Sequence, residues 1–235
     1  MAEQKVMNRW PTVVGAILIQ LALGAIYAWS VFTPALKEFG WTTAQTQFVF
    51  AAGLVFFAIV MVWAGKQMPK WGPRKLAMLG GTVLGLGYIL GGIVSLGSPS
   101  PLALTLTIGV IGGSGIGLGY VVPIAVGMRW FPDKKGLITG LAVAGFGFGA
   151  MLWVKLAGAW GNLIETYGLG PTFIIYGVAF FLMVVVGGMW MVFPPEGPQP
   201  AGWTPPPPKQ GQVAEGVNFN AAEMLRSPQY YMVFL

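Results

Sequence analysis

Two polar side chains near the start of the chain have the spacing of a ligand-binding strip. Gln20 and Tyr27 are seven residues apart in a run that is otherwise almost entirely apolar, with Gly24 between them. Positions i, i+4 and i+7 of an α-helix share one face, so the amide and the phenol hydroxyl could donate hydrogen bonds to one ligand. Alternatively, either group could hydrogen-bond a neighbouring helix, a contact that stabilises helix pairs in lipid by about 1 kcal/mol.

A third candidate is Tyr120, which lies on one helical stripe with Gly113 and Gly117. A large hydroxyl-bearing ring beside two positions without side chains fits a ligand recess. The same spacing also fits close helix packing, because the pattern Gly-x-x-x-Gly lets two backbones approach. Phe146, within the segment GFGFG, would make one wall of such a recess apolar.

The residue types that most often perform catalysis or bind metals are missing or poorly placed. The chain has no histidine and no cysteine. This excludes disulfides, thiol chemistry, zinc sites of the usual kind and an imidazole base. The acidic residues fall in predicted loops or at helix ends, so none is buried to carry a proton. We therefore expect no enzyme activity, no metal site and no cofactor.

Composition places the chain in a membrane. Hydrophobic residues make up 55% of its 235 positions and charged residues only 9%, with a mean hydropathy of +0.70. A soluble domain carries roughly a quarter of its residues as charges. The 36 glycines suit helices that pack closely in lipid.

Six apolar runs are long enough to cross about 30 Å of hydrocarbon, which takes about 20 helical residues. They cover residues 11–32, 43–64, 75–96, 101–126, 137–158 and 170–193. Thr42 and Gln45 have the spacing of a capping box at the start of the second run. The sequence therefore predicts an all-α membrane protein with three parts. These are a six-transmembrane-helix bundle at 1–193, an extended interdomain linker at 194–220 and the start of a seventh helix at 221–235.

The basic residues alternate between the two sides of these runs. Eleven of the 13 lysines and arginines precede the first run or follow the second, fourth and sixth: Lys5, Arg9, Lys66, Lys70, Arg74, Lys75, Arg129, Lys134, Lys135, Lys209 and Arg226. Cytoplasmic loops retain positive charge, so we expect the amino terminus and the linker in the cytoplasm. The net charge of +6 is then a topology signal, and we expect no nucleic-acid partner.

Two residues near the outer ends of their runs are expected at the membrane interface. Trp29 would be an aromatic anchor. Lys155 lies about 18 residues into the fifth run, a rise of ~27 Å, and would extend its ammonium group to the headgroups. Attraction of anions from outside is the alternative role for Lys155.

Several segments resemble a known family. Between the second and third runs the chain reads GKQMPKWGPRK, similar to the pattern G-x-x-x-D-R-x-G-R-R/K of the major facilitator superfamily. Pro69 stands at the acidic position of that pattern, so a charge relay through an aspartate is absent. The segments NRW (8–10), GAIYAWSVF (24–32), RWFPDKKGLITG (129–140) and FNAAEMLRSPQYY (219–231) resemble its oxalate/formate antiporter branch. That branch is related to the monocarboxylate (lactate and pyruvate) transporters.

The resemblance implies a twelve-helix secondary transporter of the plasma membrane, of which this chain forms the amino-terminal six-helix half. The implied partners are a small carboxylate, a proton, the lipid bilayer and a carboxyl-terminal half. That half would supply an anion-pairing arginine and any proton-carrying acid. We expect proton-coupled transport of a lactate-like monocarboxylate by alternating access. Oxalate/formate exchange is the alternative within the family.

Two other classes fit less well. The first is a seven-helix receptor or retinal protein, and a cytoplasmic amino terminus and the lack of a carboxylate in the third run argue against a light-driven pump of this kind. A membrane enzyme would lack groups for acid–base or metal chemistry. The expected substrate-binding residues are Tyr120, Tyr27, Gln20 and Phe146, and the resemblance assigns the carboxylate to Tyr120. The residues expected to set topology and hold the inner gate closed are Lys66, Lys70, Arg74 and Lys75.

Overall fold

The computed structural model describes residues 8–195 and 221–232, and within these ranges the chain forms helices and turns without a β-strand. Six helical segments are long and apolar enough to cross a membrane: Trp10–Glu38, Thr43–Trp71, Pro73–Val94, Pro101–Trp130, Lys135–Ala157 and Leu169–Gly188. This confirms the predicted fold class, an all-α six-helix bundle.

Four of the spans are single α-helices, and two change their winding along their length. The single helices are α3 (Thr43–Trp71), α4 (Pro73–Val94), α7 (Lys135–Ala157) and α9 (Leu169–Gly188). The first span consists of α1 (Trp10–Leu23), the 3₁₀-helix η1 (Gly24–Phe32) and α2 (Thr33–Glu38). The fourth consists of α5 (Pro101–Leu104), the π-helix η2 (Thr105–Gly112) and α6 (Gly113–Trp130). Helix α8 (Leu163–Tyr167) lies between α7 and α9.

Residues 221–232 belong to a separate unit and form two short helices, α10 (Ala221–Arg226) and α11 (Pro228–Met232). The predicted linker at 194–220 lies outside the described residues except for Pro194 and Pro195. The linker and the seventh span therefore stay predictions.

Helix α3 begins where the sequence predicts and ends later. The Thr42 amide donates to Gln45 Oε1 at 2.8 Å and the Gln45 amide donates to Thr42 Oγ1 at 3.2 Å, which confirms the capping box. The helix continues through Pro69 to Trp71, beyond the predicted end at residue 64. Gly72, with φ 79°, is then the single turn residue before α4, a backbone conformation that glycine adopts at low cost. The segment expected to be a loop is thus mostly helical.

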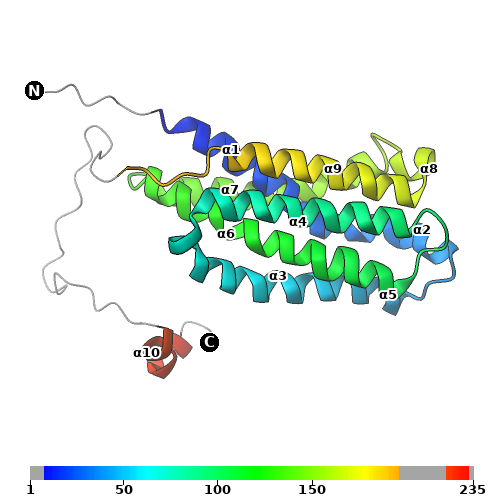
Figure 1. The fold of residues 1–235 in the computed structure, drawn as a ribbon, viewed down its shortest axis with the longest axis horizontal. Coiled ribbons are helices and arrows are strands. Elements are labelled where there is room, and N and C mark those ends of the chain that lie inside the picture. Colours follow the sequence, from blue (N-terminus) through cyan, green and yellow to red (C-terminus); the bar gives the residue numbers. More distant parts are fainter. Residues whose placement is uncertain (1–7, 196–220, 233–235) are drawn as a thin grey trace, which may run out of the picture. The chain divides into compact units, whose positions relative to one another are not determined.

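The bundle is held by close contacts between helices that are distant in sequence. Helix α4 packs against α9 and α6, α3 packs against α6, and α1 packs against α7, α9 and α6. Figure 1 shows the beginning of α1, the α3–α4 connection and the end of α6 at one end of the bundle, with α2, α5 and α8 at the other.

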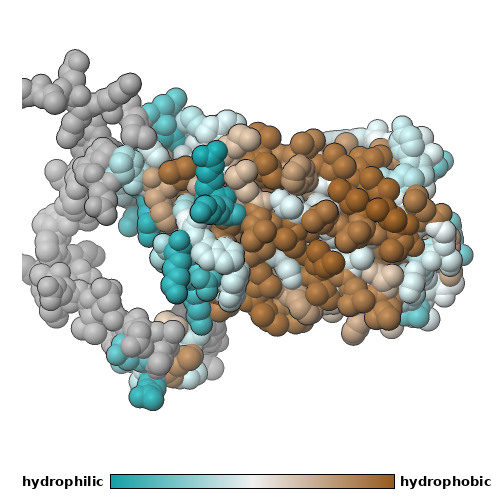
Figure 2. Space-filling model, in the orientation of Figure 1, coloured by the Kyte–Doolittle hydropathy of each residue, from teal (hydrophilic) through white to brown (hydrophobic). Residues whose placement is uncertain are grey.

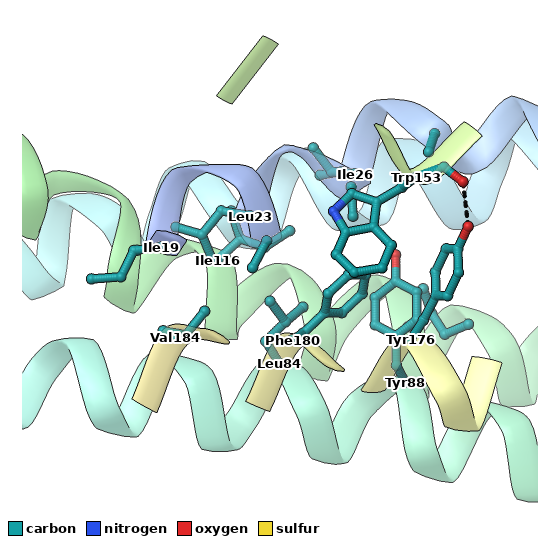
Figure 3. Close-up of a cluster of buried hydrophobic side chains, with 14 of the residues drawn as sticks. Ile19, Leu23, Ile26, Leu84, Tyr88, Ile116, Trp153, Tyr176, Phe180 and Val184 are labelled. Atoms are coloured by element: carbon teal, nitrogen blue, oxygen red, sulfur yellow. Dashed lines mark hydrogen bonds between the residues drawn. The ribbon is translucent and has the colours of Figure 1, made fainter. Parts of the chain in front are cut away.

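Aliphatic and aromatic side chains together fill the buried centre of the bundle, as Figure 3 shows. The Tyr176 hydroxyl of α9 donates to the Trp153 carbonyl of α7, and Trp153 Nε1 donates to the Leu21 carbonyl of α1 at 2.8 Å. Two hydrogen bonds therefore connect α9 to α7 and α7 to α1. Trp29 also belongs to the interior: it is 3% exposed and its Nε1 donates to the Thr46 carbonyl at 2.8 Å. The expectation of an interfacial anchor at Trp29 was wrong.

Figure 2 shows a broad hydrophobic band across the bundle with hydrophilic surface at both ends. Every span has large apolar side chains that are exposed, as expected for surface in contact with lipid or with further helices. Lys155 is exposed in the last turn of α7, near the end of its span, where the sequence places it.

Candidate functional site

Three of the four predicted ligand-binding residues come together in the structure. The rings of Tyr27 (η1) and Phe146 (α7) meet edge to face with centroids 5.5 Å apart. The ring of Tyr120 (α6) meets Phe146 in the same way at 5.0 Å. Phe146 thus joins two tyrosines that come from different spans.

Helix α3 adds two rings that the sequence interpretation missed. Phe57 lies 5.2 Å from Tyr120 and 6.4 Å from Phe146, and Phe50 lies 6.3 Å from Tyr27, measured between ring centroids. The i, i+7 spacing of Phe50 and Phe57 could have indicated one shared helix face. We call these five residues the aromatic cluster.

The cluster offers hydroxyl groups beside an apolar ring. Tyr27 is 49% exposed, Tyr120 is half-buried and Phe146 is 7% exposed. Within the described residues, neither the Tyr27 nor the Tyr120 hydroxyl forms a hydrogen bond. Both hydroxyls are therefore available to donate to a ligand, while Phe146 excludes water from its own position.

Close packing of α7 against the first span fixes Phe146. A Cβ added at Gly24 would collide with the Phe146 carbonyl oxygen, and one added at Gly149 would collide with the Leu21 carbonyl oxygen. Only residues without a side chain permit this approach. Trp153, one turn after Gly149, also donates to the Leu21 carbonyl. Helix α7 is therefore held against α1 at Gly149 and at Trp153, the two turns that follow Phe146.

Gln20 differs from Tyr27 and Tyr120 in being fully buried. Its side chain is 0% exposed, its Nε2 and Oε1 atoms have no hydrogen-bond partner, and it lies against Gly145. A ligand-binding role for Gln20 stays a prediction.

The four cations expected at the inner gate are all exposed. Lys66 and Lys70 lie in the last turns of α3, and Arg74 and Lys75 lie in the first turn of α4. Their gating role stays a prediction. No group of three acidic side chains that could hold a metal ion is present in the described ranges.

An ion pair at the same end of the bundle connects two segments that carry the family resemblance. Arg9 donates to both carboxylate oxygens of Asp133, at 2.7 and 3.1 Å. Its guanidinium also lies over the Phe131 ring, 4.3 Å from the centroid. The hydrogen bonds from Arg9 hold the pKa of Asp133 below its usual value. The sequence interpretation did not identify this pair.

Two residues next to Phe131, Arg129 and Trp130, contact the chain segment that follows the sixth span. Trp130 Nε1 donates to the Val192 carbonyl at 2.7 Å, and the Arg129 guanidinium lies over the Phe193 ring, 3.8 Å from its centroid. Residues 129–133 therefore hold both the start of the first span and the chain segment after α9.

Comparison with known proteins identifies the family. Residues 12–235 match the Major Facilitator Superfamily. The chain is 33% identical over 230 residues to the uncharacterized MFS-type transporter YhjX of Escherichia coli, covering 96% of this chain and 52% of that protein. It is 29% identical over 229 residues to the oxalate:formate antiporter of Oxalobacter formigenes, covering 97% and 51%. It is 27% identical over 178 residues to monocarboxylate transporter 14 of Mus musculus, covering 75% and 32%.

The chain spans about half the length of the first two relatives. With six membrane-spanning helices and this match, it belongs to the major facilitator superfamily of membrane transporters and has the fold of a six-helix half.

Proposed function

We propose that this chain is the amino-terminal half of a secondary transporter that moves lactate-like monocarboxylates together with protons. The aromatic cluster carries the proposal. Tyr27 and Tyr120 offer two hydroxyl donors, and hydrogen bonds to a charged group contribute about 1.5–3 kcal/mol each. Phe146 is buried against both tyrosine rings and makes the wall behind their hydroxyls apolar, which suits the uncharged end of a monocarboxylate.

A cation from outside this chain completes the proposed site. Bringing a carboxylate to mid-membrane depth without a counter-charge costs several kcal/mol. In the described part of the chain, two cations lie over aromatic rings, Arg9 over Phe131 and Arg129 over Phe193. Neither ring belongs to the aromatic cluster. We place the counter-charge and the proton-carrying acid in a carboxyl-terminal half, which would close over the cluster during alternating access.

Anion exchange of the oxalate/formate type is the second candidate. The 29% identity to an oxalate:formate antiporter favours it. The buried ring of Phe146 favours the monocarboxylate, because a dicarboxylate would place its second charge against an apolar wall.

Substitution of Tyr120 by phenylalanine tests the proposed role of its hydroxyl. In a transporter containing both halves, Tyr120→Phe removes one hydrogen bond to a charged group and little volume. The affinity for lactate should fall roughly 10- to 150-fold, with little change in melting temperature. Tyr167→Phe, which removes an exposed hydroxyl at the far end of the bundle, is the matched control and should bind lactate like the wild type.

Lactate binding and melting temperature are measured on the same preparation of each variant. A lowered melting temperature with unchanged affinity would show that the Tyr120 hydroxyl serves helix packing. The proposed role of Tyr120 in binding the carboxylate would then be wrong.

A further inference from the structure

Four exposed cations gather where α3 passes into α4. Lys66 and Lys70 end α3, and Arg74 and Lys75 begin α4, with Gly72 as the only turn residue between the helices. The sequence has no acidic residue between Glu38 and Asp133. The ion pair of Arg9 with Asp133 is the only one found among residues 8–195, so none of the four cations is neutralised there.

Two exposed tryptophans border these cations. Trp63 and Trp71 meet edge to face at 5.2 Å between centroids and are 42% and 41% exposed. Trp63, Lys66 and Lys70 are spaced i, i+3 and i+7 and share one face of α3. We call Trp63, Lys66, Lys70, Trp71, Arg74 and Lys75 the α3–α4 corner. In Figure 2, hydrophilic surface adjoins the hydrophobic band at this end of the bundle.

This combination of side chains matches the chemistry of a phospholipid at the membrane surface. Tryptophan is enriched where hydrocarbon meets headgroups, and lysine extends its stem along apolar surface while its ammonium reaches the phosphate. The cations in the first turn of α4 also repel the positive end of that helix, and a bound anion would offset the repulsion. A soluble anion would explain the cations but not the exposed indoles beside them.

We propose that the α3–α4 corner binds an anionic phospholipid, with its phosphate between the cations and its acyl chains beside Trp63 and Trp71. The proposal depends on the membrane-spanning fold and not on the transported substrate.

Native mass spectrometry of the detergent-purified chain, titrated with phosphatidylglycerol, tests the site. Each cation near an anionic lipid changes affinity about fivefold, so Lys66→Gln/Lys70→Gln should weaken binding about 25-fold. The control Lys134→Gln/Lys135→Gln removes the same charge from exposed lysines at the start of α7 and should stay within about twofold of the wild type. Lys66→Arg/Lys70→Arg should retain binding and shows that the position tolerates substitution.

Three results would overturn the proposal. Equal losses in the two glutamine variants would show diffuse attraction to the whole basic end of the bundle. Equal affinity for phosphatidylcholine and phosphatidylglycerol would show that the headgroup charge is not recognised. Displacement of phosphatidylglycerol by an equal concentration of inorganic phosphate would show that the site binds a soluble anion instead of a lipid.

Discussion

Arg9 and Asp133 join the start of the first span to the connection between the fourth and fifth, and the pair has a pH signature. The pKa of the Asp133 carboxyl is depressed in the folded state, so the ion pair stabilises the fold at pH values above the ordinary aspartate pKa of about 3.9. That contribution is lost as the pH falls through the lowered pKa. Because the pair is partly exposed, it should contribute at most about 1 kcal/mol.

Thermal melts of the wild type and Asp133→Asn at different pH values check this expectation. At neutral pH the variant should melt a few degrees lower, and the difference should begin to shrink below about pH 4 and vanish as the pH falls through the lowered pKa. Glu38→Gln, which removes an exposed carboxylate at the other end of the bundle, should follow the wild type. A constant difference between wild type and Asp133→Asn down to pH 2 would contradict the assigned ion pair.

The sequence indicates individual site residues better than it indicates their surroundings. Tyr27, Tyr120 and Phe146 can be selected because polar or unusual residues are sparse in the apolar runs. Their ring contacts depend on how three spans pack, which no local pattern specifies. Trp29 shows the limit: a tryptophan near a span end is typical of an interfacial anchor, yet here its N–H finds a buried carbonyl.

At the scale of helices, the contact between α1 and α7 positions the aromatic cluster. Gly149→Ala would place a methyl group against the Leu21 carbonyl, and such overpacking destabilises by about 1–3 kcal/mol. The variant should melt at a lower temperature and bind lactate more weakly, because α7 must shift and carry Phe146 with it. Gly147→Ala is the matched control in the same helix, since an added Cβ there meets nothing within 4 Å.

Both variants are compared by thermal melting and by lactate binding in the complete transporter. If Gly147→Ala proves as destabilising as Gly149→Ala, the described contact between α1 and α7 is not what holds Phe146.

Helix boundaries were predictable only where local chemistry marks them. The capping box at Thr42 fixes the start of α3, and the structure confirms it. The end of α3 was placed too early because Lys66, Pro69 and Lys70 are typical of a loop after an apolar run. Lysine is a good helix former, and proline is tolerated in membrane helices, so the helix extends to Gly72.

For the whole molecule, the distribution of basic residues leads us to propose a cytoplasmic amino terminus in the plasma membrane. Because the chain has no cysteine, single cysteines can report each side. Ser98→Cys, in the exposed turn after α4, should react with an impermeant thiol reagent added to intact cells. Gly136→Cys, where an added Cβ meets nothing within 4 Å, should react only after the membrane is opened. The reverse labelling pattern would invert the topology.

Uptake of lactate into proteoliposomes tests the proposed function most directly. The complete transporter, in vesicles holding no carboxylate, should accumulate labelled lactate when the interior is more alkaline and stop when a protonophore collapses the gradient. The 235-residue chain alone should show no saturable uptake, because the proposed counter-charge lies outside it. If lactate uptake requires vesicles preloaded with formate, the transporter is an exchanger and the proposed proton coupling is wrong. No saturable lactate uptake under either condition would contradict the account.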